Sequence, residues 1–308
     1  LIQGDNKGWA DDELVDNENG NYDYLMYADI DFKHPEVIQN LYDWVYWFIE
    51  TTGVQGFRLD AVKHIDSFFM RNFIRDITAK YGKDFYVFGE FWNSDETANN
   101  DYLKNIEYRF DLVDVKLHHN FFDASIAGAD FDLRTIFDQT LAKNHPESAV
   151  TFVDNHDTQR GQALESTVEE WFKPAAYALI LLRDEGLPCV FYGDYYGISG
   201  EFAQESFQDV LDKLLDVRLN LAYGEQTDYF DDANCIGWTR QGKDDGQPIA
   251  VVVSNDQASS KRMLVGSEWA GREFSDYLGK SSQIVTIDED GWGEFPVEEK
   301  SVSVWSVK

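Results

Sequence analysis

The stretch Gly56-Phe57-Arg58-Leu59-Asp60-Ala61-Val62-Lys63-His64 determines how the rest of this sequence is interpreted. Its first half is short and apolar apart from two charges, which is typical of a buried parallel strand. Side chains alternate along a strand, so Arg58 and Asp60 share one face. Charges on a buried face need partners, and the residues alone leave open whether this is a structural ion pair or part of a catalytic site.

Two further predicted strands also end in acids. The segment 84–90 is apolar until it reaches Glu90, which Phe91-Trp92 follows, and the β-branched segment 149–153 leads into Asp154-Asn155-His156-Asp157. In a parallel barrel, functional groups gather at the carboxyl ends of the strands. Three acidic strand ends therefore indicate one shared site better than three separate structural ion pairs.

These three segments resemble sequence signatures of the α-amylase family of glycoside hydrolases, at residues 56–64, 88–92 and 152–157. The stretches 165–174 and 190–194 are similar to those of bacterial liquefying α-amylases, so the resemblance extends over nearly the whole chain. The family's first signature, an Asp-x-x-x-Asn-His segment that ends the third barrel strand, is absent from this sequence.

The predicted fold is an α/β (β/α)8 TIM barrel, of which only the last five β/α units are present, followed by a C-terminal all-β antiparallel domain. Residues 1–31 are predicted to end a calcium-binding loop domain (domain B) and return to the barrel. Residues 32–223 would form the catalytic barrel, strands 4–8, and residues 224–308 a C-terminal β-sandwich. Because five strands leave two open sheet edges, we expect upstream polypeptide to complete the barrel.

Hydrophobic periodicity places the individual elements. In the barrel it predicts strands at 114–117 and 189–194 besides those named above, and helices from Pro35, at 66–80, at 99–107, from Asp130, at 171–183 and around 207–217. Ser166 and Glu169 have the spacing of a capping box upstream of the helix at 171–183. After Tyr223 we predict short strands at 235–240, 249–254, 262–265, 283–287 and 302–307.

Composition limits the partners and the compartment. The 26 basic and 57 acidic residues give a net charge of -31, which repels phosphate backbones and anionic lipid, so we expect neither nucleic acid nor a membrane as a partner. The two cysteines, Cys189 and Cys235, allow at most one disulfide, and two reduced thiols are the favoured interpretation. Together with the resemblance of residues 234–236 and 301–305 to cytoplasmic bacterial α-amylases, this favours a cytoplasmic location, with secretion as the alternative.

Retaining glycoside hydrolysis needs one ionised and one protonated carboxyl group. Asp60 is predicted to be the nucleophile, because Arg58 on the same strand face can keep it ionised and oriented. Glu90 is predicted to be the general acid and base, because its aromatic neighbours favour the protonated form. The resemblance implies that Asp157 is the third catalytic residue and stabilises the distorted sugar.

The resemblance also assigns substrate-binding residues. It implies that His156 hydrogen-bonds the sugar ring at the cleavage point and that Lys63 and His64 contact the leaving-group side. Trp92 either stacks on a sugar or packs in the core. With Arg58, these residues complete the predicted substrate site.

The first 31 residues predict a calcium site. They hold nine carboxylates, and Asp23, Asp29 and Asp31 are closely spaced oxygen donors of the kind that Ca²⁺ prefers, although such runs also form solvated acidic surfaces. The resemblance implies that Asp23, Asp29 and the backbone carbonyl of His64 ligate at least one Ca²⁺, and that Asp12 and Asp31 join a neighbouring metal cluster. Lys33 stands where close relatives carry Asp, which argues against a second Ca²⁺ or an adjacent Na⁺.

The function predicted for this sequence is endo-hydrolysis of α-1,4-glucosidic bonds in starch, glycogen or maltodextrins, with retention of anomeric configuration. A transglycosylase of the same family and a noncatalytic glucan-binding fragment are alternatives. A metal-dependent phosphohydrolase is a third, built on His156-Asp157 and the acidic loop. It would need several His and Asp ligands around one ion, whereas His118, His119 and His145 lie outside the strand-end pattern.

Overall fold

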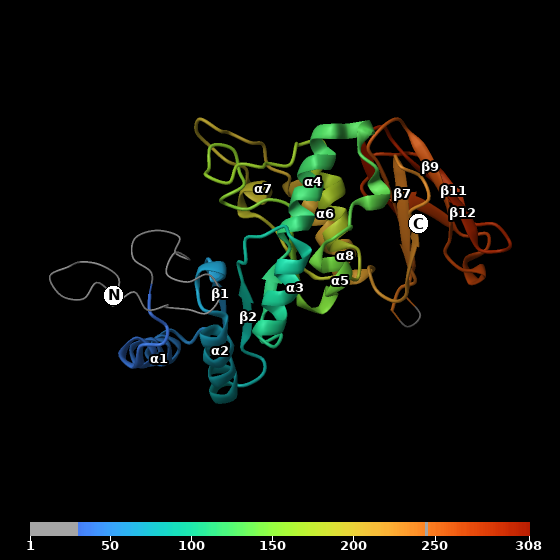
Figure 1. The fold of residues 1–308 in the computed structure, drawn as a ribbon. Coiled ribbons are helices and arrows are strands. Elements are labelled where there is room, and N and C mark those ends of the chain that lie inside the picture. The colour runs from blue at the N-terminus through green and yellow to red at the C-terminus, as the bar shows by residue number, and fades with distance from the viewer. Residues whose placement is uncertain (1–29, 244–245) are drawn as a thin grey trace. The chain divides into compact units, whose positions relative to one another are not determined.

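The structure is a computed structural model that describes residues 30–243 and 246–308 (Figure 1). The chain divides into two compact units. The first contains the residues up to Val115 together with 148–150, and the second contains 116–147 and 151–308. None of the helices in the described residues is long and apolar enough to cross a membrane. Cys189 and Cys235 are not joined by a disulfide, as predicted.

The α/β part of the chain is built on five strands in the sheet order β1-β2-β3-β4-β5. Pairing from β1 to β4 is parallel and follows the chain order, which confirms the predicted β/α units. All of β4 is buried, whereas β1 and β5, the two outer strands, are partly exposed. That further strands complete the barrel stays a prediction. The bounds are β1 Gly56–Leu59, β2 Tyr86–Gly89, β3 Asp111–Val113, β4 Ala149–Phe152 and β5 Leu187–Cys189.

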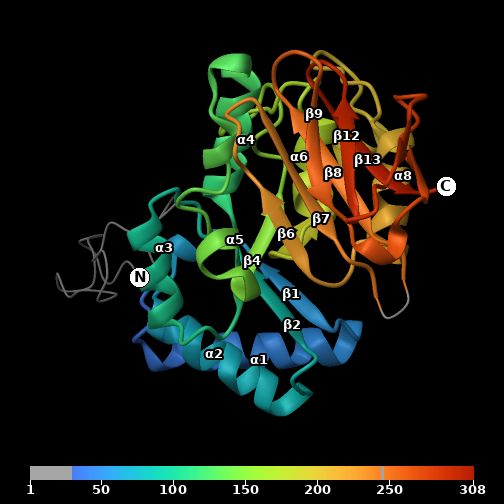
Figure 2. The same cartoon turned by 90° about the vertical axis from the view of Figure 1, so that its right-hand side faces the viewer.

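In the first unit, helices α1 (Pro35–Thr52) and α2 (Ser67–Tyr81) lie along β1 and β2 (Figure 2). Their contact surface is aromatic: the ring centroids of Tyr42 and Phe73 are 5.2 Å apart, and Phe48 of α1 packs on Phe57 of β1 at 6.2 Å. Asp66 caps α2 by accepting a hydrogen bond from the backbone of Phe69 at 2.7 Å. The remaining helices of this unit are η3 Val62–His64 and α3 Glu96–Asn105.

The second unit contains most of the remaining helices and an antiparallel part. The helices are α4 Val115–Ala127, η4 Gly128–Asp130, η5 Leu133–Thr135, α5 Leu141–Asn144, α6 Lys173–Leu181, α7 Tyr192–Tyr196, α8 Gln208–Asn220 and η7 Ser267–Trp269. A further short helix, η6 Pro146–Ser148, ends at the start of β4.

The antiparallel part confirms the predicted all-β C-terminal region. Six strands form one sheet in the order β11-β10-β13-β8-β7-β6, and β12 pairs with β9. Phe274, Phe295 and Trp305 are fully buried in its core. The strands are β6 Gln226–Tyr229, β7 Cys235–Arg240, β8 Ile249–Ser254, β9 Ser259–Leu264, β10 Glu273–Asp276, β11 Ile284–Thr286, β12 Trp292–Val297 and β13 Ser301–Val307.

Two predicted barrel strands are wrong in position. Residues 114–117 begin helix α4, because Leu117, Phe121 and Ala124 bury one helical face, and the strand lies just before them at β3. The predicted strand 189–194 is instead the end of β5, after which Tyr192–Tyr196 turns into α7. Apolar residues alone did not distinguish a short strand from a short buried helix at these two places.

Two helix predictions also fail. The helix expected from Asp130 is replaced by the short turns η5 and α5. The capping box is wrong, because α6 begins at Lys173 with a proline in its first turn and has no side-chain cap. Ser166 instead lies within hydrogen-bonding distance of His118, at 2.8 Å.

Candidate active site

In the first unit, one guanidinium contacts two acids that follow neighbouring strands. Arg58 Nη1 donates to Asp60 Oδ1 at 2.6 Å, and Arg58 Nη2 lies 3.2 Å from Glu90 Oε1. Asp60 follows β1 and Glu90 follows β2, which pair in parallel. Arg58 therefore contacts both the predicted nucleophile and the predicted acid/base. The strand pattern did not predict its contact to Glu90.

The backbone around Glu90 fixes its carboxyl group. Ala61 N–H donates to Glu90 Oε2 at 3.1 Å, Glu90 N–H donates to the Leu59 carbonyl at 2.8 Å, and Val62 N–H donates to the Glu90 carbonyl at 3.1 Å. Ala61 adopts a left-handed conformation, with φ 47°, which is strained for a residue with a Cβ. The turn after β1 thus aims an amide hydrogen at the carboxylate that follows β2.

The two carboxyl groups differ in exposure. The side chain of Asp60 is 71% exposed, whereas that of Glu90 is 9% exposed and Phe91 beside it is buried. An exposed carboxylate can approach a reacting carbon, while a buried one is shielded from bulk water. The asymmetry is that expected for a nucleophile and a general acid/base.

The other predicted residues of the first unit lie next to these acids in the chain. Lys63 and His64 belong to η3, directly after the Asp60 turn, and Trp92 follows Glu90 by two residues; all three are partly buried.

Most of the predicted calcium ligands cannot be placed. Asp12, Asp23 and Asp29 lie outside the described residues. Asp31 is described, and its Oδ1 accepts a hydrogen bond from the backbone of Lys33 at 2.9 Å. Residues 30–243 and 246–308 contain no group of three or more His, Cys, Asp or Glu side chains that could hold a metal ion. The donors predicted for this site are hard oxygens, which fit Ca²⁺, and the site stays a prediction.

In the second unit, β4 leads into the predicted His156-Asp157 pair. The Asn155 side chain shapes this turn, because its Oδ1 accepts from the backbone N–H of Asp157 at 2.8 Å and of Thr158 at 3.0 Å. His156 Nε2 lies 3.2 Å from Asp157 Oδ2, and both side chains reach solvent, with 62% and 35% exposure. The two residues can therefore meet a ligand at the end of β4.

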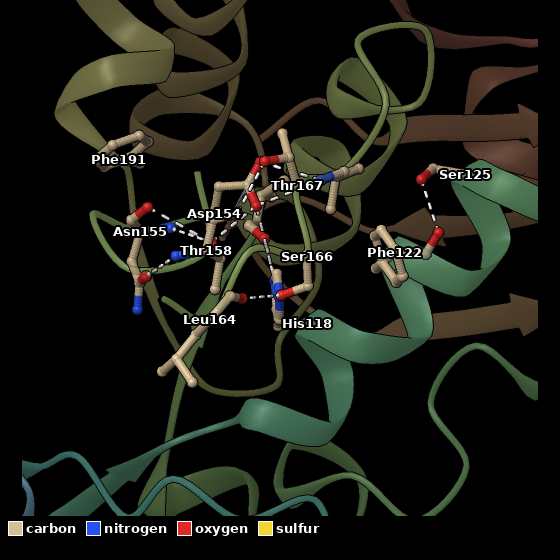
Figure 3. A network of polar contacts seen from close by, with 12 residues as sticks. His118, Phe122, Ser125, Asp154, Asn155, Thr158, Leu164, Ser166, Thr167 and Phe191 are labelled. Carbon is tan, nitrogen blue, oxygen red and sulfur yellow. Dashed lines mark hydrogen bonds and ion pairs between the residues drawn. The ribbon is translucent and has the colours of Figure 1, made fainter. Parts of the chain in front are cut away.

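A buried ionic cluster adjoins this turn, and Figure 3 shows one member, Asp154, beside Thr158. Asp154 accepts from the Thr158 hydroxyl at 3.0 Å and pairs with Lys173 of α6 at 2.8 Å. Lys173 also pairs with Asp194 of α7, and Tyr177 donates to Asp194 at 2.5 Å. Burial raises the pKa of Asp154 to about 6, opposed by the Lys173 ammonium. Sequence analysis missed Lys173; a lysine inside the apolar run that forms α6 was the available signal.

His118 of α4 supports the same strand end. Its Nε2 lies 2.8 Å from the Ser166 hydroxyl (Figure 3). Its Nδ1 donates to the Val153 carbonyl at 2.6 Å, and its ring stacks on Phe152. Burial lowers the pKa of His118 to about 4, so the imidazole is neutral at pH 7. Both ring nitrogens have partners within the protein, so this histidine serves as a structural support rather than a metal ligand.

Known proteins that resemble this chain include α-amylases. A family model described as "Alpha amylase, catalytic domain" matches residues 3–243, and one described as "Alpha-amylase C-terminal" matches residues 249–306. An "Alpha-amylase" of Geobacillus stearothermophilus is 48% identical over 99% of this chain and 55% of its own length. A "Cytoplasmic alpha-amylase" of Escherichia coli is 40% identical over 98% of this chain and 62% of its own length. The chain thus spans little more than half the length of these relatives.

A solved structure supports the fold. The crystal structure of an α-amylase from Geobacillus thermoleovorans, complexed with acarbose, superposes with a TM-score of 0.69. The superposition covers 90% of this chain and 65% of the Geobacillus thermoleovorans chain. At 23% sequence identity it is evidence for the fold alone.

The neutral buried His118 predicts a specific pH dependence. Between pH 6.5 and about 4, His118 is protonated in the unfolded chain but stays neutral in the folded protein. The contribution of His118 to the free energy of unfolding therefore falls as the pH falls through this window, by about 3 kcal/mol in total. The raised pKa of Asp154 acts in the opposite direction over nearly the same range. The measurement must therefore compare variants.

We expect His118→Asn to be less stable than the wild type at pH 7.5 and the difference to shrink as pH falls from 6.5 to 4, measured by urea unfolding at each pH. Leu141→Ala, at a buried apolar residue of α5, removes no titratable group, so it is the control and should show a constant difference. A gap between wild type and His118→Asn that stays constant with pH would show that His118 is not held neutral by burial.

Proposed function

We propose that this chain, which belongs to the α-amylase family, cleaves internal α-1,4-glucosidic bonds of starch, glycogen and maltodextrins with retention of configuration. The observation that carries the proposal is the guanidinium of Arg58, which holds Asp60 and Glu90 at the ends of adjacent parallel strands. Both acids contact one planar group, and the retaining mechanism, in which Asp60 attacks the sugar directly, is the one that the family resemblance implies.

In the first step, Glu90 donates its proton to the glycosidic oxygen while Asp60 Oδ attacks the anomeric carbon. The bond from that carbon to the leaving oxygen breaks, and an ester between Asp60 and the sugar forms. In the second step, Glu90 removes a proton from a water molecule, the water oxygen bonds to the anomeric carbon and the ester breaks. Both acids then regain their starting protonation states, and two inversions amount to retention.

Arg58 has two tasks in this scheme. While Asp60 is ionised, the bond from Nη1 orients the attacking oxygen. When Asp60 becomes an ester and loses its charge, Glu90 has become the anion, and the contact from Nη2 stabilises it. The positive charge therefore serves whichever carboxyl group is ionised at each stage.

The remaining roles follow the family resemblance. Asp157 stabilises the positive charge that develops on the sugar ring, and His156 hydrogen-bonds the same ring. Lys63 and His64 bind the leaving-group side, and Trp92 offers a ring face for stacking on a sugar. The high identity to relatives named α-amylase favours hydrolysis over transglycosylation, and the paired acids favour catalysis over simple glucan binding.

Replacing either acid should separate the two roles. Asp60→Asn and Glu90→Gln are each expected to lower kcat on starch by about a thousandfold or more, because each removes a group that acts in the transition state. Sodium azide should restore turnover to glycine variants of both acids. It should give the β-azide with Asp60→Gly, because azide attacks the α-linked substrate with inversion, and the α-azide with Glu90→Gly, because azide attacks the β-linked ester. The matched control is Asp84→Asn, an exposed acid upstream of β2, which should retain wild-type kcat. Near-normal turnover in either Asp60→Asn or Glu90→Gln would refute the assignment.

We further propose that Ca²⁺ binds to the carboxylates of Asp23 and Asp29 and the backbone carbonyl of His64, with Asp12 and Asp31 beside it. Bound there, the ion would link the acidic N-terminal segment to the turn that follows Asp60. Removing it with EDTA should lower the midpoint of thermal unfolding, and Ca²⁺ should restore it, with about 3 kcal/mol of stabilisation at a hundredfold excess over Kd. Mg²⁺ is the control ion, because its smaller octahedral shell suits this donor set poorly. An unfolding midpoint that EDTA leaves unchanged would contradict the proposal.

We also propose a cytoplasmic location. It is supported by the relative from Escherichia coli that is named cytoplasmic and by the absence of a disulfide between Cys189 and Cys235. Amylase activity should then stay with washed, intact source cells and enter solution only when the cells are lysed. Activity found chiefly in the medium of intact cells would favour secretion.

A further inference from the structure

A cavity of about 490 Å³ lies in the second unit, away from the strand ends described above. Its apolar lining residues come from α8 and the residues that follow it, and three arginines also line it, one of them in α8. The lining residues are Arg183, Asp184, Leu215, Arg218, Leu219, Ala222, Tyr223 and Arg240. The chain has a net charge of -31, whereas this cavity is lined by three cations and one acid.

The three arginines are not equivalent. Arg183 is fully engaged, because its Nε and both terminal nitrogens bind the carboxylates of Glu185 and Asp228 at 2.7–3.1 Å. It also packs on the rings of Phe137 and Phe230, with the guanidinium carbon 4.7 and 5.1 Å from their centroids. We therefore assign Arg183 a structural role.

Arg240, at the end of β7, is 4% exposed and only partly neutralised. Its Nε and Nη1 donate to the backbone carbonyls of Gly224 and Leu182, and its Nη2 donates to Asp184 at 3.1 Å. The Asp184 side chain is 74% exposed, so water weakens this ion pair.

Arg218 of α8 has still fewer partners. Its Nη1 donates to the Leu181 carbonyl at 2.7 Å, and no carboxylate among the described residues lies within 4.0 Å of its guanidinium. Burial lowers the pKa of Arg218, and the positive charge of Arg240 lowers it further. A partly buried guanidinium that faces a second one is destabilised unless an anion joins them.

We propose that this cavity binds a small organic phosphate, with its phosphate group between Arg218 and Arg240 and its organic part on the wall formed by Leu215, Leu219 and Tyr223. Guanidinium groups bind phosphate oxygens through paired hydrogen bonds, and Arg218 has four of its five N–H donors unused among the described residues. Lys243, whose Nζ lies 5.7 Å from the centroid of the Tyr223 ring, adds a cation at the exposed rim. A volume of about 490 Å³ has room for a sugar phosphate.

Isothermal titration calorimetry with glucose 6-phosphate tests the proposal, with inorganic phosphate in a second arm. The wild type should bind glucose 6-phosphate, and more tightly than inorganic phosphate, because only the sugar phosphate contacts the apolar wall. Arg218→Gln should weaken binding by about tenfold or more, the effect of losing a charge-assisted hydrogen bond. Arg262→Gln, at an exposed arginine of β9 that pairs with Asp288, is the matched control and should bind as the wild type does.

A second variant covers the case in which Arg218→Gln disturbs the fold. Leu219 is 70% exposed, so Leu219→Glu leaves the arginine hydrogen bonds intact while placing a negative charge on the cavity wall. It should weaken glucose 6-phosphate binding while the midpoint of thermal unfolding stays at the wild-type value. The proposal is overturned if the wild type binds neither probe, if inorganic phosphate binds as tightly as the sugar phosphate, or if both cavity variants bind like the control. None of these outcomes depends on starch hydrolysis, so the proposed function is tested separately.

Discussion

The ion pair network of Arg58 is the interaction on which the first unit's chemistry depends. A parallel strand places its carboxyl end beside that of its neighbour, so a cation on β1 can reach the acid after its own strand and the acid after the next. A cation within reach of both carboxyl groups favours the ionised form of either one. The remaining features serve this arrangement: the left-handed turn at Ala61 directs an amide at Glu90, and burial limits how far Glu90 can move.

In the second unit a different cation, the Lys173 ammonium, pairs with an acid near the end of a strand. Lys173 is completely buried and pairs with Asp154, which precedes the exposed His156-Asp157 turn. Asp154 and His118 have opposite pKa shifts caused by the same burial, since burial disfavours the carboxylate in one and the imidazolium in the other. At the end of β4 the buried groups thus hold the turn, and the exposed ones are left available for a ligand.

The sequence predicted the strand-end acids well because each is marked locally, by a charge that interrupts an apolar run. It predicted the Arg58–Asp60 pair from alternation along a single strand, but the contact from Arg58 to Glu90 depends on the register between strands, which no local pattern encodes. Lys173 was missed for the same reason: its partners lie 19 and 21 residues away in the chain and meet it only in the folded state. The misplaced strand at 114–117 shows the other limit, that short apolar runs fit a strand or a buried helix equally well until packing decides.

The measurement that tests this account most directly is to trap and locate the covalent intermediate. A 5-fluoro-α-glucosyl fluoride would slow the second step, and peptide mapping by mass spectrometry would then locate the attached sugar. The account predicts one sugar on the peptide that contains Asp60, released when a maltodextrin acceptor is added. A sugar attached to Glu90 instead, or rapid turnover that gives the β-anomer as the first product with no adduct at any stage, would contradict the shared-guanidinium mechanism.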